Sequence, residues 1–211
     1  MHAAEVIAMG YRYPSPGAVE ALAEAVESST QGGVKRHLTQ FVTEVRSLSI
    51  GAWEELHTTT LDLSPLFVPY VGHVEWGENY RRGEFMSDLN AAMSEAGVDL
   101  DGELPDHIAP VLRYLSMTAE PLLDLIQVLP GAVDTMTKTL AKAAPNSPYR
   151  HLLAATADFA AGFAGHAERA GGSRAAVSSA MSRAASSGTE FRLRRKSNGN
   201  ASWAGTGEAP R

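Results

Sequence analysis

Apolar residues recur at intervals of three and four along most of the 211-residue chain, which is the spacing of one face of an α-helix. Five such stripes lie within residues 34–48, 85–96, 108–115, 122–140 and 152–163. No pair of alternating apolar and polar runs predicts a β-hairpin. The pattern therefore predicts an all-α fold, a single-domain helical bundle.

Proline and serine mark several helix boundaries. Ser15-Pro16 and Ser147-Pro148 each place an N-cap residue before a proline suited to the first helical position. Pro130 interrupts the fourth stripe, and a proline inside a helix removes one backbone hydrogen bond. We therefore expect helix starts at the two serines and a bend or break at Pro130.

Residues 50–76 are less regular than the rest of the chain. A short helix is expected at 53–60 and a further start at Ser64-Pro65, while Pro69 prevents a long helix. Two interpretations remain open. The segment could bend around a groove, or it could be a buried connector, which its spacing favours.

The composition changes near residue 168. Residues 1–168 form the predicted helical domain, and residues 169–211 form a Gly/Ser/Ala-rich basic tail, which we expect to be largely disordered. The tail carries eight Lys or Arg against two Asp or Glu, whereas the domain carries ten against 22. The default interpretation of the basic segment 191–196 is a solvated tail, and the alternative is a mimic of a basic peptide ligand.

Composition restricts the compartment and the partners. The chain has no cysteine, which excludes disulfides and thiolate metal sites. Its first residues lack the basic and apolar regions of an export signal, and no apolar run is long enough to span a bilayer. We expect a cytoplasmic protein that does not insert into membranes. An acidic domain also repels nucleic acid, so no nucleic-acid partner is expected.

Motifs for catalysis and cofactor binding are missing from the sequence. The seven histidines form no H-x-x-x-H pair, and there is no phosphate-binding glycine loop and no G-x-S-x-G nucleophile motif. We therefore expect no metal, no cofactor and no enzymatic activity.

The most informative cluster is Glu103, Asp106 and His107. Pro105 is placed near the start of a helix, where the Asp106 carboxylate would face the positive end of the helix dipole. Pro110 has no N–H, so the Asp106 carbonyl would lack its helical partner. One hypothesis is a patch of acceptors for an arginine or amide donor, with Asp106→Asn weakening a basic ligand while leaving the fold intact. The alternative is an ordinary helix start.

Arg81 and Arg82 stand out in an acidic domain. Glu78 lies four residues before Arg82, so a salt bridge within one helix is expected. Pairing across helices and binding of an anion remain alternatives. The methionines at 86, 93, 117 and 136 are assigned to the core, the alternative being an adaptable peptide groove.

Several motifs occur in order along the first 168 residues. They are M-G-Y-R-Y-P-S-P (9–16), L-D-L-S-P-L-F-V-P-Y (61–70), W-G-E-N-Y-R-R-G-E-F-M (76–86), E-L-P-D-H (103–107) and S-P-Y-R-H-L-L (147–153). Together they resemble the NarJ branch of the TorD-like chaperones, which mature molybdenum enzymes. Residues 73–76 and the basic tail depart from the family pattern.

The resemblance implies a chaperone that binds the N-terminal leader of a molybdoenzyme catalytic subunit and assists insertion of the molybdenum cofactor. The implied client is the α subunit of respiratory nitrate reductase. Glu103, Asp106 and His107 match the family motif, and with Tyr70 and Arg82 they form the expected peptide-binding set. A monomer or weak dimer is expected.

Three alternatives remain. The client could be a selenate, chlorate or dimethyl sulfide enzyme. The chain could instead be a metal-dependent helical hydrolase that uses Asp106 and His107, or a structural subunit of a permanent complex.

Overall fold

The computed structural model describes residues 2–63 and 65–163. These residues form helices and no strand, which confirms the predicted all-α class. The elements are α1 (Ala3–Gly10), α2 (Ala18–Ser29), α3 (Gly32–Arg46), α4 (Ile50–His57), the π-helical turn η1 (Thr58–Asp62), α5 (Val71–Trp76), α6 (Tyr80–Glu95), α7 (Ile108–Met117), α8 (Leu123–Ala143) and a helical segment at 149–163. The predictions for the tail, 169–211, concern residues outside the described ranges.

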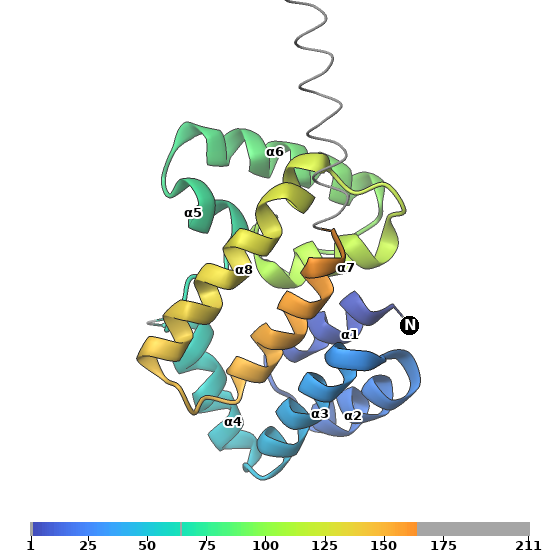
Figure 1. Cartoon of the computed structure of the whole chain (residues 1–211), viewed down its shortest axis with the longest axis vertical. Helices are drawn as coiled ribbons and strands as arrows, with labels where there is room; N and C mark the ends of the chain where they lie inside the picture. Colours follow the sequence, from blue (N-terminus) through green and yellow to red (C-terminus); the bar gives the residue numbers. More distant parts are fainter. Residues whose placement is uncertain (1, 64, 164–211) are drawn as a thin grey trace, which may run out of the picture. The chain divides into compact units, whose positions relative to one another are not determined.

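Helix α7 lies at the centre of the packing. All its residues from Ile108 to Leu115 are buried, which is unusual for a helix with only one apolar stripe. Helix α1 packs against α7, α2 against α3, and α5 against α8. In Figure 1, α5 and α6 lie at one end of α8, and α3 and α4 lie at the other. The start of α7 is thus surrounded by other elements.

The predicted apolar stripes coincide with α3, α6, α7, α8 and the segment 149–163. The start at Ser147 is confirmed, because its hydroxyl accepts from the Tyr149 N–H at 3.4 Å. One boundary prediction is wrong. Helix α2 begins at Ala18, after Gly17 in the left-handed conformation (φ 83°), rather than after Ser15. Helix α8 runs from Leu123 to Ala143 with Pro130 inside it, so the break expected at Pro130 is absent, while the expected bend stays a prediction.

The irregular segment between α4 and α5 is partly buried. Helix α4 passes directly into η1, and residues 65–69 form bends and irregular coil before α5 begins at Val71, so no helix starts at Pro65. Thr60, Leu61 and Phe67 are buried. Leu63 and Val68 are exposed, and Asp62 lines a cavity, so the segment combines features of both interpretations.

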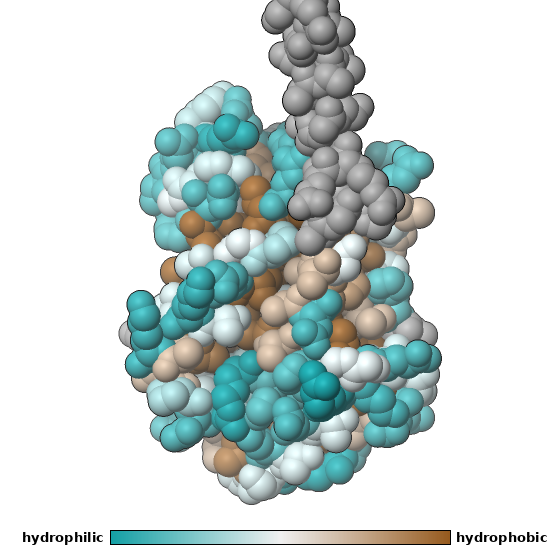
Figure 2. Space-filling view, in the orientation of Figure 1, coloured by the Kyte–Doolittle hydropathy of each residue, from teal (hydrophilic) through white to brown (hydrophobic). Residues whose placement is uncertain are grey.

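The surface of the described part is mixed in character. Figure 2 shows hydrophilic residues over much of the face that carries α6 and α8, with apolar residues visible between those helices. Met93 and Met136 are buried, as assigned. Met117 is 55% exposed, so its assignment to the core is wrong. Among the described helices, none has both the length and the apolar character that a bilayer span requires.

Candidate functional site

The structure brings the five predicted site residues together at the start of α7. Tyr70 and His107 form an isolated antiparallel β-bridge. The Val71 N–H donates to the Asp106 carbonyl at 2.8 Å, and the Ile108 N–H donates to the Pro69 carbonyl at 2.8 Å. The chain that leads into α5 is thereby fixed to the chain that leads into α7.

A buried ion pair lies behind this bridge. Arg82 on α6 donates from Nε to Asp106 Oδ2 at 2.8 Å and from Nη2 to Asp106 Oδ1 at 3.4 Å. Its guanidinium carbon lies 5.7 Å from the centroid of the Tyr70 ring. The hydrogen bond to Asp106 holds the pKa of Arg82 above its ordinary value. Arg82 therefore joins α6 to the start of α7 as a permanent cation.

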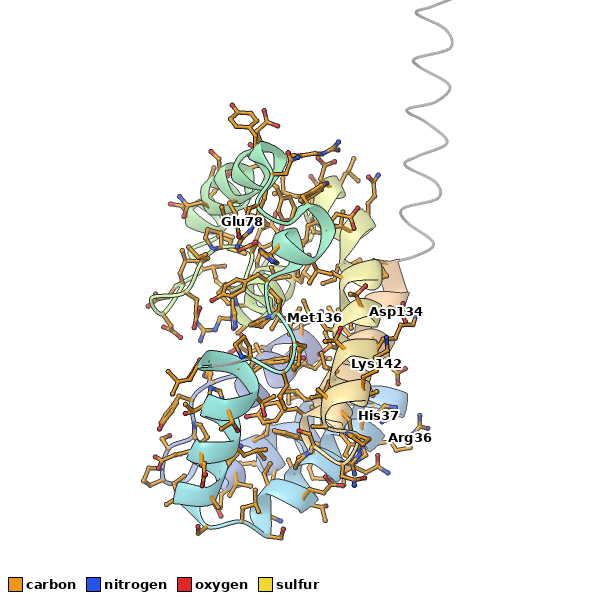
Figure 3. All side chains as sticks on the ribbon, turned by 90° about the vertical axis from the view of Figure 1, so that its left-hand side faces the viewer. Arg36, His37, Glu78, Asp134, Met136 and Lys142 are labelled. Atoms are coloured by element: carbon orange, nitrogen blue, oxygen red, sulfur yellow. The ribbon has the colours of Figure 1, made fainter. Side chains whose placement is uncertain are left out.

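Glu78 continues this network toward the surface. Its carboxylate lies 3.2 Å from Arg82 Nη1 and 3.0 Å from His73 Nδ1, and Figure 3 shows it between α5 and α6. The predicted salt bridge between Glu78 and Arg82 is present, but Glu78 precedes the first residue of α6, so the pair does not lie within one helix. The pairing of Arg82 across helices, weighed as an alternative, is also present.

The prediction that Asp106 presents free acceptors is wrong. Its side chain is 0% exposed, and both carboxylate oxygens accept from Arg82. Its carbonyl accepts from Val71, because α7 begins at Ile108 and Pro105 lies before the helix. A ligand cannot reach this carboxylate without breaking the ion pair. Because Asp106 is buried against Arg82, we now expect Asp106→Asn to destabilise the fold rather than to leave it intact.

His107 caps α7 and is held neutral. Its Nδ1 accepts from the Ala109 N–H at 3.3 Å, so the imidazole fills the N-cap position that Asn, Asp or Ser usually occupies. Burial, with smaller contributions from His57 and Arg113, lowers its pKa to about 4. Its ring packs edge-on against Tyr70, with centroids 5.2 Å apart. At neutral pH the His107 side chain is therefore polar but uncharged.

Glu103 is the most accessible of the motif residues. It is half-buried, and the Tyr70 hydroxyl donates to its Oε2 at 3.5 Å. Burial raises its pKa, and the neighbouring carboxylate of Asp62 raises it further, while the bond from Tyr70 opposes both. Two carboxylates therefore lie close enough to repel each other.

These two carboxylates line a cavity of about 330 Å³ between α1, the end of α4, η1 and α7. Aromatic rings form much of its wall, and the Tyr13 and His57 rings lie 5.4 Å apart. His57 is fixed by Tyr149, whose hydroxyl lies 2.9 Å from Nδ1. The residues that line the cavity are Tyr11, Arg12, Tyr13, His57, Asp62, Leu100, Asp101, Glu103, His107, Ala109, Pro110 and Arg113.

The two arginines that line this cavity have ion-pair partners, whereas two of its carboxylates have none in the described part of the chain. Arg12 forms an ion pair with Glu5, and Arg113 forms one with Asp101. Within residues 2–63 and 65–163, neither Asp62 nor Glu103 forms an ion pair. Two neighbouring carboxylates without a cation, beside aromatic rings, suit a guanidinium or ammonium group.

Only Glu103 and His107 of the five predicted residues line the cavity. Tyr70, Arg82 and Asp106 support them from behind. Sequence reasoning missed Asp62, Tyr13 and His57. The T-T-T-L-D run offered a weak signal, because three β-branched residues in a row disfavour a regular helix, and π-helical turns often occur at functional sites.

No three His, Asp or Glu side chains of the described residues are placed to hold a metal ion. The chemistry that the site offers is recognition by charge, aromatic rings and hydrogen bonds. Neither a comparison with models of known protein families nor a search of curated protein sequences finds a match for the chain.

Proposed function

We propose that this protein is a maturation chaperone of the NarJ kind, which binds the basic N-terminal leader of a molybdoenzyme catalytic subunit. The client that we propose is the α subunit of respiratory nitrate reductase. The chaperone would hold the apoenzyme until its molybdenum cofactor is inserted. The role requires capture and release of a peptide and no covalent step.

The observation that carries this proposal is the pair Asp62 and Glu103 at the cavity. Both are acidic, both line the same cavity, and neither has an ion-pair partner among the residues described. The repulsion between them would be relieved by a bound cation, so part of the binding free energy comes from charge that the free protein leaves uncompensated. Tyr13 would add a cation–π contact to the same group.

Apolar side chains follow these acids in the chain. Leu63, next to Asp62, is 83% exposed, and Leu104, next to Glu103, is 47% exposed. A leader that is disordered when free and amphipathic when helical could place apolar residues against such side chains while its cation enters the cavity. Folding on binding keeps the affinity moderate and allows release.

The network behind the cavity has a positioning role in this proposal. The Arg82–Asp106 ion pair and the bridge between Tyr70 and His107 fix the backbone that follows Glu103. Tyr70 holds the Glu103 carboxylate directly. A site built on such supports needs little reorganisation when a ligand binds.

Capture of the client from nitrate-grown cells tests the proposal. Tagged protein is expected to retain the apo form of the nitrate reductase α subunit, and Glu103→Gln is expected to reduce that yield several-fold. Glu20→Gln is the matched control, because it removes the same charge from an exposed position on α2 that does not line the cavity. Equal recovery of the client by both variants would contradict the role of Glu103. Recovery of a selenate, chlorate or dimethyl sulfide enzyme instead would identify that enzyme as the client.

A further inference from the structure

A second cavity adjoins the first across α7. It has a volume of about 550 Å³ and is lined by Glu5, Arg12, Val98, Asp99, Asp101, Arg113, Ser116 and Met117. Arg12, Asp101 and Arg113 line both cavities. The two cavities are therefore neighbours that share a wall, and Arg113 is part of that wall.

Arg113 is a buried cation with a spare donor. It is 8% exposed. Its Nη1 donates to the Asp99 carbonyl at 2.8 Å, and its Nη2 donates to the Asp101 carboxylate. Its Nε is buried and has no hydrogen-bond partner among the described residues. A buried donor that lacks an acceptor is costly, so an acceptor from outside this part of the chain would be stabilising.

Asp101 holds Arg113 from an exposed and unusual position. It is the one non-glycine residue with a positive φ (52°) in the described ranges, and Gly102 follows it at φ 82°. Its N–H donates to the Asp99 carboxylate at 2.9 Å. An exposed carboxylate on such a turn is easier to exchange for another carboxylate than one buried on a helix.

We propose that Arg113 binds a carboxylate of the ligand peptide, which takes the place of the Asp101 carboxylate. This inference rests on the proposed function and specifies its ligand further. The two cavities together would then accept a leader with a basic residue for Asp62 and Glu103, an acidic residue for Arg113, and an apolar residue for Val98 and Met117. A purely basic leader would leave the spare donor of Arg113 unused.

Asp101→Asn tests the exchange directly, because asparagine tolerates the left-handed conformation and keeps the turn. Calorimetry with the nitrate reductase leader is expected to show three- to tenfold tighter binding to this variant, since the competing carboxylate is gone. The gain should vanish for the same leader with its acidic side chains converted to amides. Asp134→Asn, an exposed change on α8 that lines neither cavity, is the control and should change nothing.

The opposite sign would overturn the inference. If Asp101 only attracts the leader's basic residues, Asp101→Asn weakens binding, as Glu103→Gln does. Weaker or unchanged binding by Asp101→Asn, with intact binding by the wild-type protein, therefore removes the role of Arg113 and leaves the proposed function standing.

A second measurement does not depend on the leader. The Nε–H resonance of Arg113, assigned by its loss in Arg113→Lys, is followed by NMR in Asp101→Asn during titration with acetate to about 0.1 M at constant ionic strength. A saturating shift with acetate, larger than in the wild-type protein and absent with chloride, supports the inference even if no leader binds. No shift, or the same shift with chloride, overturns it.

Discussion

At the scale of single residues, Asp106 and His107 are adjacent in the chain but have different structural roles. Asp106 is sealed in the interior by Arg82, whereas His107 caps α7 and forms part of the cavity wall. Both are polar groups in places where burial penalises charge. Each therefore makes a prediction about stability that is separate from any effect on binding.

Asp106→Asn should destabilise the fold by about 3 kcal/mol, because it leaves the buried Arg82 without its counter-charge. Urea denaturation measures this as a lower free energy of unfolding. The double variant Arg82→Met with Asp106→Leu should recover much of the loss, since a buried ion pair can be exchanged for apolar side chains at small cost. A fully stable Asp106→Asn protein would show that the ion pair contributes little.

His107 should make stability depend on pH. The pKa of His107 is about 4 in the folded protein, whereas the ordinary pKa of a histidine, which applies to the unfolded chain, is 6.5. Between these values the unfolded chain binds a proton that the folded protein does not, so stability falls as the pH is lowered through this range. The loss attributable to His107 at about pH 4.5 should be about 2 kcal/mol.

His107→Asn isolates this effect, because asparagine keeps an N-cap acceptor and does not titrate. Urea denaturation near pH 7 and near pH 4.5 should show a smaller loss in the variant than in the wild-type protein. Equal losses in the two proteins would mean that His107 is not the group that resists protonation.

At the scale of elements, α5 and α6 are packed closely around the ion pair. A Cβ added at Gly72 on α5 would lie 2.8 Å from Asp106 Oδ2 and 3.0 Å from the Phe85 ring. Gly83 on α6 has no such neighbour within 4 Å. The two glycines therefore serve different purposes, close approach in the first case and none that packing requires in the second.

Alanine substitution should change the stability of the protein in opposite directions at the two glycines. Gly72→Ala is expected to lower the free energy of unfolding by about 1 to 3 kcal/mol through overpacking. Gly83→Ala is expected to raise it by up to about 1 kcal/mol, because alanine favours the helix. Thermal denaturation of both variants checks the pair, and two changes of the same sign would contradict the packing described for α5.

Helical spacing predicted the elements better than their ends. The stripes of α3, α6 and α8 were visible because each of these helices buries one face, whereas the burial of α7 on every side was not predictable from its single stripe. Pro130 does not end α8, since residues on both sides of it, from Leu125 to Leu140, are buried in the core. The late start of α2 depends on Gly17 adopting a positive φ, and the π-helical turn depends on tertiary packing. Neither leaves a periodic signal.

At the scale of the whole molecule, the cavity collects residues from segments far apart in the sequence. Tyr13, His57 and Glu103 come from three different parts of the chain. The sequence pattern pointed to Glu103 and His107 because they form one local cluster. It could not identify Asp62, and it could not show that Arg82 donates to both carboxylate oxygens of Asp106. Both facts depend on how segments distant in the sequence pack together.

The central claim is that uncompensated carboxylates at this cavity capture a basic leader. Calorimetry of the wild-type protein against the N-terminal leader of the nitrate reductase α subunit, near 0.05 M and near 0.5 M salt, tests it most directly. We expect saturable binding that weakens by about five- to tenfold at the higher salt concentration, because screening removes roughly 1 kcal/mol of charge attraction. No binding at low salt, or binding that is insensitive to salt, would contradict the claim.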